Sequence, residues 1–182
     1  MAGWVDRSVT IRIDELDAAA IEEHLDALAP LLLDAHESGM ALGLAAPLSP
    51  DGARAAYQDA AAKLAPGERI LLATFDDEEL VGAVQLDRAD AGNGRHRAEI
   101  RRLVVRADRR GGGVGRALMD AVVEAARVLE LGLLWLSTHD GSDADRVYER
   151  LGWTRAGVIP DSAQLPNGEL SSNAFYFLKV NG

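Results

Sequence analysis

Apolar residues recur along the chain with two spacings, one typical of strands and one typical of helices. Strict alternation over residues 9–13 (VTIRI) predicts a half-buried first strand. A spacing of three to four residues then predicts a helix that Asp14 or Asp17 caps. Pro30 is expected to kink this helix, or to split it in two, before Gly39. The apolar stripe of the helix consists of Ile21, Leu25, Leu28 and Leu32.

The next part of the chain alternates between loop and regular structure. Residues 40–48 are rich in Ala and Leu without a clear period, and we expect a loop whose side chains enter the core or, second, line a binding cleft. The cap, proline and acid at 49–51 predict a helix over residues 50–64, which the Pro-Gly pair at 66–67 ends.

Three strands are expected after this helix. Two apolar runs at 69–75 and 80–87 flank the acidic turn 76–79, which is the pattern of a hairpin. A loop over residues 88–97 then separates them from a fourth strand at 98–106.

The stretch from residue 101 to residue 129 combines a strand, a glycine loop and a helix, and it reads RRLVVRADRRGGGVGRALMDAVVEAARVL. After the turn at 107–110, a one-sided apolar pattern predicts a helix that continues to Leu131. Gly132 ends this helix, and residues 133–138 predict a buried strand.

The last part of the sequence predicts one helix and two strands. Ser142, with an acid three positions later, forms a capping box for a helix that Gly152 ends. Residues 153–159 and 173–180 have strand patterns, and the connection between them is rich in turn residues.

Length, composition and charge narrow the class of protein. The 182 residues fit one domain, expected to span residues 1–182, because no linker divides them. There is no cysteine, no leader-like start and no long apolar run, so we expect a cytoplasmic protein with no membrane partner. The net charge of -10 argues against nucleic acid as a partner and is compatible with a cationic or zwitterionic amine.

The glycine loop is the strongest candidate for a binding site. Glycines at a helix N-terminus leave free N–H groups and no Cβ in the way, so phosphate is the expected ligand. The spacing fits neither a P-loop, since Gly115 is followed by Arg116 and Ala117, nor a dinucleotide-binding loop. What remains is Arg-x-x-Gly-x-Gly, formed by Arg110, Gly113 and Gly115.

This loop, together with the helix DADRVYERLGW about thirty residues later, resembles the two motifs of the GCN5-related N-acetyltransferase (GNAT) superfamily. The resemblance implies an α/β (α+β) fold, with a central mixed, mostly antiparallel sheet of about seven strands flanked by helices on both faces. It also implies acetyl-CoA as the acetyl donor, no metal, and a monomer or homodimer.

Within the superfamily, the segments GLLWLSTHDGS and PNGELSSNAFYF are most similar to the tabtoxin resistance acetyltransferases, which acetylate an amino group of a toxin. An antibiotic- or toxin-resistance role is therefore one expectation. Two positions depart from the pattern: Gly141 replaces an Asn ahead of the tyrosine helix, and Ser137 replaces an expected acid on the fifth strand.

Carried over position by position, the resemblance implies the site residues. Glu99 takes the place of an acid early on the fourth strand, and Tyr148 the usual place beside the thioester sulfur. The cofactor-binding residues would be Leu103, Val104, Val105, Arg110, Gly111, Gly112, Gly113, Val114, Gly115 and Arg116.

The chemistry of amine acetylation assigns roles to these side chains. An amine must lose a proton before it attacks, so Glu99 is the candidate general base. Tyr148 is the candidate general acid for the leaving thiolate, and a backbone N–H of residues 103–105 is expected to polarise the carbonyl. His139 is a second candidate base, and the histidine spacings support no metal site.

Three functions therefore stand: acetylation of a small-molecule amine, acetylation of a protein N-terminus or lysine, and a non-catalytic acetyl-CoA-binding module. Intact Glu99 and Tyr148 argue against the binding module.

Overall fold

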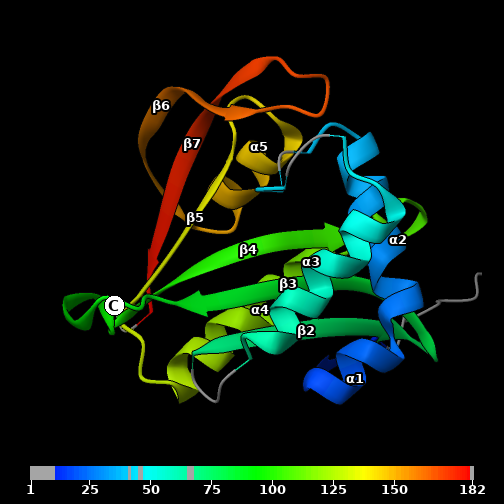
Figure 1. The fold of residues 1–182 in the computed structure, drawn as a ribbon. Helices are drawn as coiled ribbons and strands as arrows, with labels where there is room; N and C mark the ends of the chain where they lie inside the picture. The colour runs from blue at the N-terminus through cyan, green and yellow to red at the C-terminus, as the bar shows by residue number, and fades with distance from the viewer. Residues whose placement is uncertain (1–10, 41, 45–46, 65–67, 181–182) are drawn as a thin grey trace, which may run out of the picture.

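The computed structural model describes residues 11–40, 42–44, 47–64 and 68–180. Within them, seven strands form one sheet in the order β1-β2-β3-β4-β5-β7-β6 (Figure 1). Every neighbouring pair is antiparallel except β4 and β5, which run parallel. The strands are β1 (Ile11–Glu15), β2 (Arg69–Asp76), β3 (Glu79–Arg88), β4 (Arg97–Val105), β5 (Leu133–His139), β6 (Thr154–Gln164) and β7 (Leu170–Lys179).

Helices cover both faces of this sheet, as expected for the fold class. One apolar cluster packs the β1–β4 part of the sheet against helices of the N-terminal region, and a second cluster packs the other face against α4 (Figure 1). The helices are α1 (Ala18–Glu23), α2 (Leu25–Glu37), α3 (Pro50–Ala62), α4 (Val114–Val128) and α5 (Asp143–Arg150). The mixed, mostly antiparallel seven-stranded sheet confirms the predicted α/β (α+β) class.

The predicted caps account for the starts of three helices. Asp17 accepts a hydrogen bond from the Ala20 N–H at 2.8 Å, and Ser49 and Ser142 cap α3 and α5 in the same way. Each cap satisfies an N–H group that would otherwise have no partner in the first turn.

The predicted break at Pro30 is wrong. The first helical region divides six residues earlier, at His24, whose N–H donates to Ala20 O at 3.0 Å and closes α1. Pro30 is accommodated inside α2. A proline deletes only its own N–H bond, here the one that would reach the Asp26 carbonyl, and packing of the apolar stripe on both sides compensates for that loss.

The predicted end of the sixth strand at residue 159 is also wrong, because β6 continues to Gln164. Pro160 lies in an irregularity of the pairing with β7, between Ile159 and Ala163, where Asp161 has a φ of 50°. Pro is tolerated there because β6 is the edge strand and one side of its backbone needs no ladder bond. The first strand is confirmed over residues 11–13; residues 9–10 and the Pro-Gly pair at 66–67 lie outside the described residues.

The apolar side chains of residues 40–48 support the core interpretation of that loop. Met40, Leu42, Leu44 and Leu48 pack against the cluster under α1, α2 and α3.

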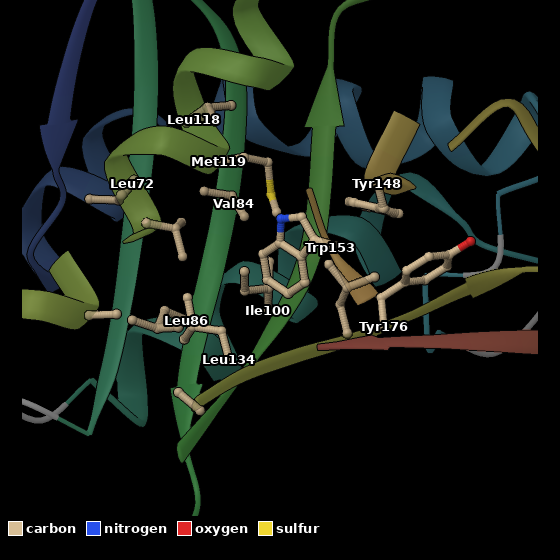
Figure 2. Close-up of a cluster of buried hydrophobic side chains, with 14 of the residues drawn as sticks. Leu72, Val84, Leu86, Ile100, Leu118, Met119, Leu134, Tyr148, Trp153 and Tyr176 are labelled. Carbon is tan, nitrogen blue, oxygen red and sulfur yellow. The ribbon is translucent and has the colours of Figure 1, made fainter. Parts of the chain in front are cut away.

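The cluster on the α4 face joins the two ends of the sheet. A Cβ at Gly82 of β3 would lie 3.1 Å from the Leu118 side chain, which shows how closely α4 approaches the sheet. Figure 2 shows Leu118 and Met119 of α4 in one cluster with side chains from the C-terminal region, namely Leu134, Tyr148, Trp153 and Tyr176. No helix in the described part of the chain combines the length and the apolar character needed to cross a membrane.

Candidate active site

The sheet opens between its two parallel strands. β4 and β5 pair only through residues 97–99 and 133–135. Beyond Glu99, β5 remains paired with β7 up to His139 and turns away from β4, so that a wedge-shaped gap separates the strands (Figure 1). Within the described residues, no strand pairs with this side of the second half of β4, which therefore has a free backbone edge in the middle of the sheet.

A β-bulge shapes this free edge. Arg102 and Leu103 of β4 lie opposite the single residue Val84 of β3, and Arg102 has a φ of 51°. Backbone groups of a strand alternate between its two edges, and the Arg106 N–H donates to Val81 O of β3 at 2.9 Å. The Leu103 and Val105 amides therefore face the gap. Val104, the third predicted contact, pairs with Ala83 and has a buried side chain.

Arg102 fixes the bulge from the opposite side. Its Nη1 donates to the Ala56 carbonyl of α3 at 3.3 Å, and its Nε and the Tyr57 hydroxyl are buried without a hydrogen-bond partner among the described residues. Burial, followed by repulsion from Arg101, lowers the pKa of the Arg102 guanidinium. Arg102 was not among the predicted site residues, because only the strand register distinguishes it from the neighbouring arginines.

The glycine loop lies between the end of β4 and the start of α4. Gly111 and Gly113 have φ of 76° and 90°, a region that favours glycine. Gly113 is the N-cap of α4 and, having no side chain, leaves the N–H groups of Val114, Gly115 and Arg116 without a side-chain cap. These donors, together with the positive end of a fifteen-residue helix, form a site suited to an anion.

The arginines of the loop have different surroundings. Arg110 Nε donates to Val105 O at 2.9 Å, and its other nitrogens contact Ser38 and Asp34 of α2. The Arg110 side chain thus ties the loop to α2. The Arg116 side chain is exposed and lies 3.7 Å from Asp120.

Tyr148 belongs to the cluster on the α4 face (Figure 2). Its ring contacts Trp153 and Tyr176 with centroid distances of 6.2 and 5.7 Å, and only 7% of the residue is exposed. Burial raises the pKa of Tyr148 to about 12. The hydroxyl therefore keeps its proton at every pH at which the protein would work.

Glu99 points to the opposite face of the sheet. Its strand neighbours Ala98 and Ile100 enter the α4 cluster, and side chains alternate along a strand. Glu99 lies in a cleft of about 400 Å³ between the ends of α3, β2, β3 and β4 and the start of β5. Burial raises the pKa of its carboxyl; the Arg101 guanidinium at 3.7 Å opposes this, and Asp87 adds to it.

The remaining predicted positions lie in β5 and in the turn between β5 and α5. His139 Nδ1 is hydrogen-bonded to the Ser171 hydroxyl, which occupies one ring nitrogen of the second candidate base. Ser137 pairs with Phe175 across β5 and β7 and is exposed. The Gly141 N–H donates to the Asp145 carboxylate at 3.0 Å, at the start of α5. Among the described residues, no three metal-ligating side chains come together.

The structure thus brings the glycine loop and the free edge of β4 to one side of the gap. Tyr148 and Glu99 lie on opposite faces of the sheet.

A family model described as "Acetyltransferase (GNAT) family" matches residues 27–153. Three solved structures illustrate the similarity of the fold. The chain is 17% identical to yncA from Salmonella typhimurium, solved with its cofactor acetyl-CoA, with 94% of each chain covered and a TM-score of 0.75. It is 22% identical to aminoglycoside 6'-acetyltransferase type Ii, covering 94% of this chain and 98% of that chain, with a TM-score of 0.72. It is 21% identical to a ribosomal-protein-alanine N-acetyltransferase from Brucella melitensis, covering 92% and 99%, with a TM-score of 0.75.

Proposed function

This chain belongs to the acetyltransferase (GNAT) family, and from that premise we propose that it moves the acetyl group of acetyl-CoA to the primary amine of a small molecule. An amino-acid-like toxin or antibiotic is the class of acceptor that the sequence favours. The observation that carries the proposal is the gap between β4 and β5, with an anion site at one end and a charged cleft on the far face of the sheet.

The residues of the gap fit acetyl-CoA. At the loop, glycines leave open space where side chains would stand, since a Cβ at Gly111 or Gly113 would meet nothing within 4 Å. The N–H groups at the start of α4 would bind the pyrophosphate. The amides of Leu103 and Val105 would bind the acyl arm along the free edge of β4, and acetyl-CoA, when bound, supplies the thioester that is attacked.

Glu99 is proposed to accept the proton of the acceptor amine, directly or through a water. Its raised pKa favours this role, because a carboxylate is a better base when its pKa lies nearer the working pH. The mixed charge of the surrounding cleft can hold an amine beside it.

Tyr148 is proposed to donate a hydrogen bond, and then a proton, to the leaving thiolate. Burial raises its pKa to about 12, which keeps the proton on the hydroxyl for donation and also makes the hydroxyl a weaker acid than that of a free tyrosine. A preorganised N–H of Leu103 or Val105 would polarise the carbonyl, and fixed orientation of the two substrates can contribute about 7–11 kcal/mol to the rate.

Mass spectrometry of the products tests the proposal. The protein is incubated with acetyl-CoA and, separately, amino acids, amino-sugar antibiotics, polyamines and peptides. We expect an acetylated small molecule with free CoA in equal amount. Acetylation confined to peptides would instead favour a protein acetyltransferase, and acetyl-CoA binding without any product would favour a binding module.

The Glu99→Gln protein links the products to this site. It should bind acetyl-CoA as the wild type does and lose the acid limb of the kcat/KM profile, with a lower plateau. Two acceptors of different amine pKa separate the limbs, because a limb that moves with the acceptor belongs to the substrate. Full activity with an unchanged profile would remove Glu99 from the mechanism.

A further inference from the structure

The cleft around Glu99 has a charge pattern unlike that of the whole chain. The chain has a net charge of -10, yet the cleft has five basic and four acidic lining residues. The basic ones are Lys63, Arg69, Arg88, Arg97 and Arg101. A cleft that binds only a cationic amine would not be expected to contain several arginines. Whether each arginine already has a partner therefore indicates which of them can bind a ligand.

Most of these cations are already engaged. Arg69 makes two parallel bonds of 2.7 Å to the carboxylate of Asp87, and both side chains are mostly buried. Lys63 pairs with Asp59 at 2.7 Å, and Arg88 Nε donates to the Arg95 carbonyl at 2.7 Å. The Arg69–Asp87 pair joins β2 to β3 at the wall of the cleft.

Arg101 is engaged only weakly. Its guanidinium lies 3.5 Å from Asp87 and 3.7 Å from Glu99, longer than a good charge-assisted bond, and its side chain is 36% exposed. Asp87 makes its two short bonds to Arg69, and the contact with Arg101 is the longer one, so most of the five N–H donors of Arg101 remain unused. On the other side, the loop residue Gly43 lies against it, since a Cβ there would be 3.4 Å from Arg101 Nη2.

We propose that Arg101 binds the carboxylate of the acceptor while Glu99 binds its amine, so that the substrate is an α-amino acid or a close analogue. This rests on the proposed function. Arg101 and Glu99 are two positions apart on β4 and extend from the same face, with charged atoms 3.7 Å apart. An amine and a carboxylate separated by one or two carbons span such a pair. A guanidinium also binds a carboxylate in a two-bond geometry that an ammonium group cannot provide.

The experiment compares amino acids with their primary carboxamides, which have nearly the same shape but no negative charge. We expect the wild type to acetylate the acid with a kcat/KM at least tenfold above that of the amide. Amidation also lowers the pKa of the neighbouring amine, which favours the amide and therefore works against the expected result. Arg101→Gln should abolish the preference, mainly through KM for the acid, and the loss of kcat/KM should be much smaller for the amide, which has no carboxylate to bind.

Two further variants keep the outcome interpretable. Arg97→Gln removes another cation from the same cleft and should leave the preference intact, whereas Arg101→Lys should retain part of it. Thermal unfolding and acetyl-CoA affinity establish that each variant is folded. Equal turnover of acids and amides by the wild type, a preference that survives Arg101→Gln, or one that is lost in Arg97→Gln would overturn this inference while the proposed function stood. No transfer to any small amine would overturn both.

Discussion

The two ends of the sheet are built differently. In the half formed by β1–β4, helices cover both faces, and β2 and β3 are buried along most of their lengths. In the half formed by β5, β7 and β6, the edge strand β6 is exposed along nearly all of its length, with Ile159 52% exposed. The first half contains most of the buried apolar residues, whereas β5 of the second half contributes Trp135 to the cleft around Glu99.

The difference explains where a site can form. A sheet whose neighbouring strands pair along their full length has no open backbone edge in its interior. Here the two halves are joined only by the three-residue parallel pairing of β4 with β5. They remain one body because side chains of the C-terminal half, including Leu134 and Trp153, join the α4 cluster (Figure 2). The halves are therefore held together by side chains on the α4 face and by the short pairing of β4 with β5.

One substitution in the α4 cluster and one on the exposed edge strand test this structural difference most directly. Leu118→Ala removes a fully buried side chain at the centre of the α4 cluster and should cost about 2–5 kcal/mol in the free energy of unfolding. Ile159→Ala, on the exposed edge strand, should cost less than about 1 kcal/mol. Denaturant titration measures both. Similar losses would mean that β6 is buried in solution, for example in a dimer.

Tyr148→Phe tests whether the C-terminal half supplies chemistry or only packing. If its hydroxyl assists departure of the thiolate, kcat should fall about 10²-fold with little change in KM for acetyl-CoA. Tyr176→Phe is the matched control: Tyr176 donates to Asp145 at 2.6 Å, so its loss should lower stability by about 0.5–1.5 kcal/mol and leave kcat nearly unchanged. Equal turnover by Tyr148→Phe and the wild type would limit Tyr148 to the core.

How much the sequence reveals also differs between the two halves. The hairpin at 69–87 and the strand, glycine loop and helix after residue 101 follow from local periodicity, and the structure confirms them, although α4 ends at Val128 and not at the predicted Leu131. The extension of β6 past Pro160 was not predicted, because tolerance of that proline depends on the strand being at an edge.

The cleft was only partly predictable. Glu99 was predicted from the family resemblance, but Arg69, Asp87 and Arg101 come together through strand register, which a single sequence does not specify. The bulge at Arg102 was missed for the same reason. Which of these residues touch substrates stays a prediction that the variants above test.

Gly115→Val tests the anion site at the start of α4, which covers one face of the β1–β4 half of the sheet. Gly115 is in the first turn of α4, where a new Cβ would make an ordinary contact of 3.7 Å with Val105. The helix should tolerate it, but the branched side chain would stand where phosphate approaches, so acetyl-CoA affinity should fall at least about tenfold. Gly92→Val, in open space before β4, should bind normally. Calorimetry that finds unchanged affinity in a folded Gly115→Val protein would remove the cofactor from the loop.

Glu99 is the last residue of β4 that pairs with β5. Its burial predicts a small effect of pH on the free energy of unfolding. Burial raises its pKa above the ordinary value of 4.5, so the folded protein holds this proton at a pH where the unfolded chain has lost it. Wild-type stability should therefore fall as pH rises from about 4.5 through the folded pKa. Glu99→Gln cannot ionise, so it should be the more stable protein at pH 8, and this advantage should disappear near pH 4.

Loss of the 3.7 Å contact with Arg101 acts in the opposite direction, which keeps the gain small. Urea titrations of both proteins at the two pH values measure it, with Glu78→Gln in the exposed β2–β3 turn as the control for loss of a surface carboxylate. If Glu99→Gln is instead the less stable protein by a constant amount at both pH values, then Glu99 serves the fold as a partner of Arg101. A gain confined to high pH would mean that the protein retains a carboxylate that lowers its stability, as expected when the group is kept for its reactivity and not for its packing.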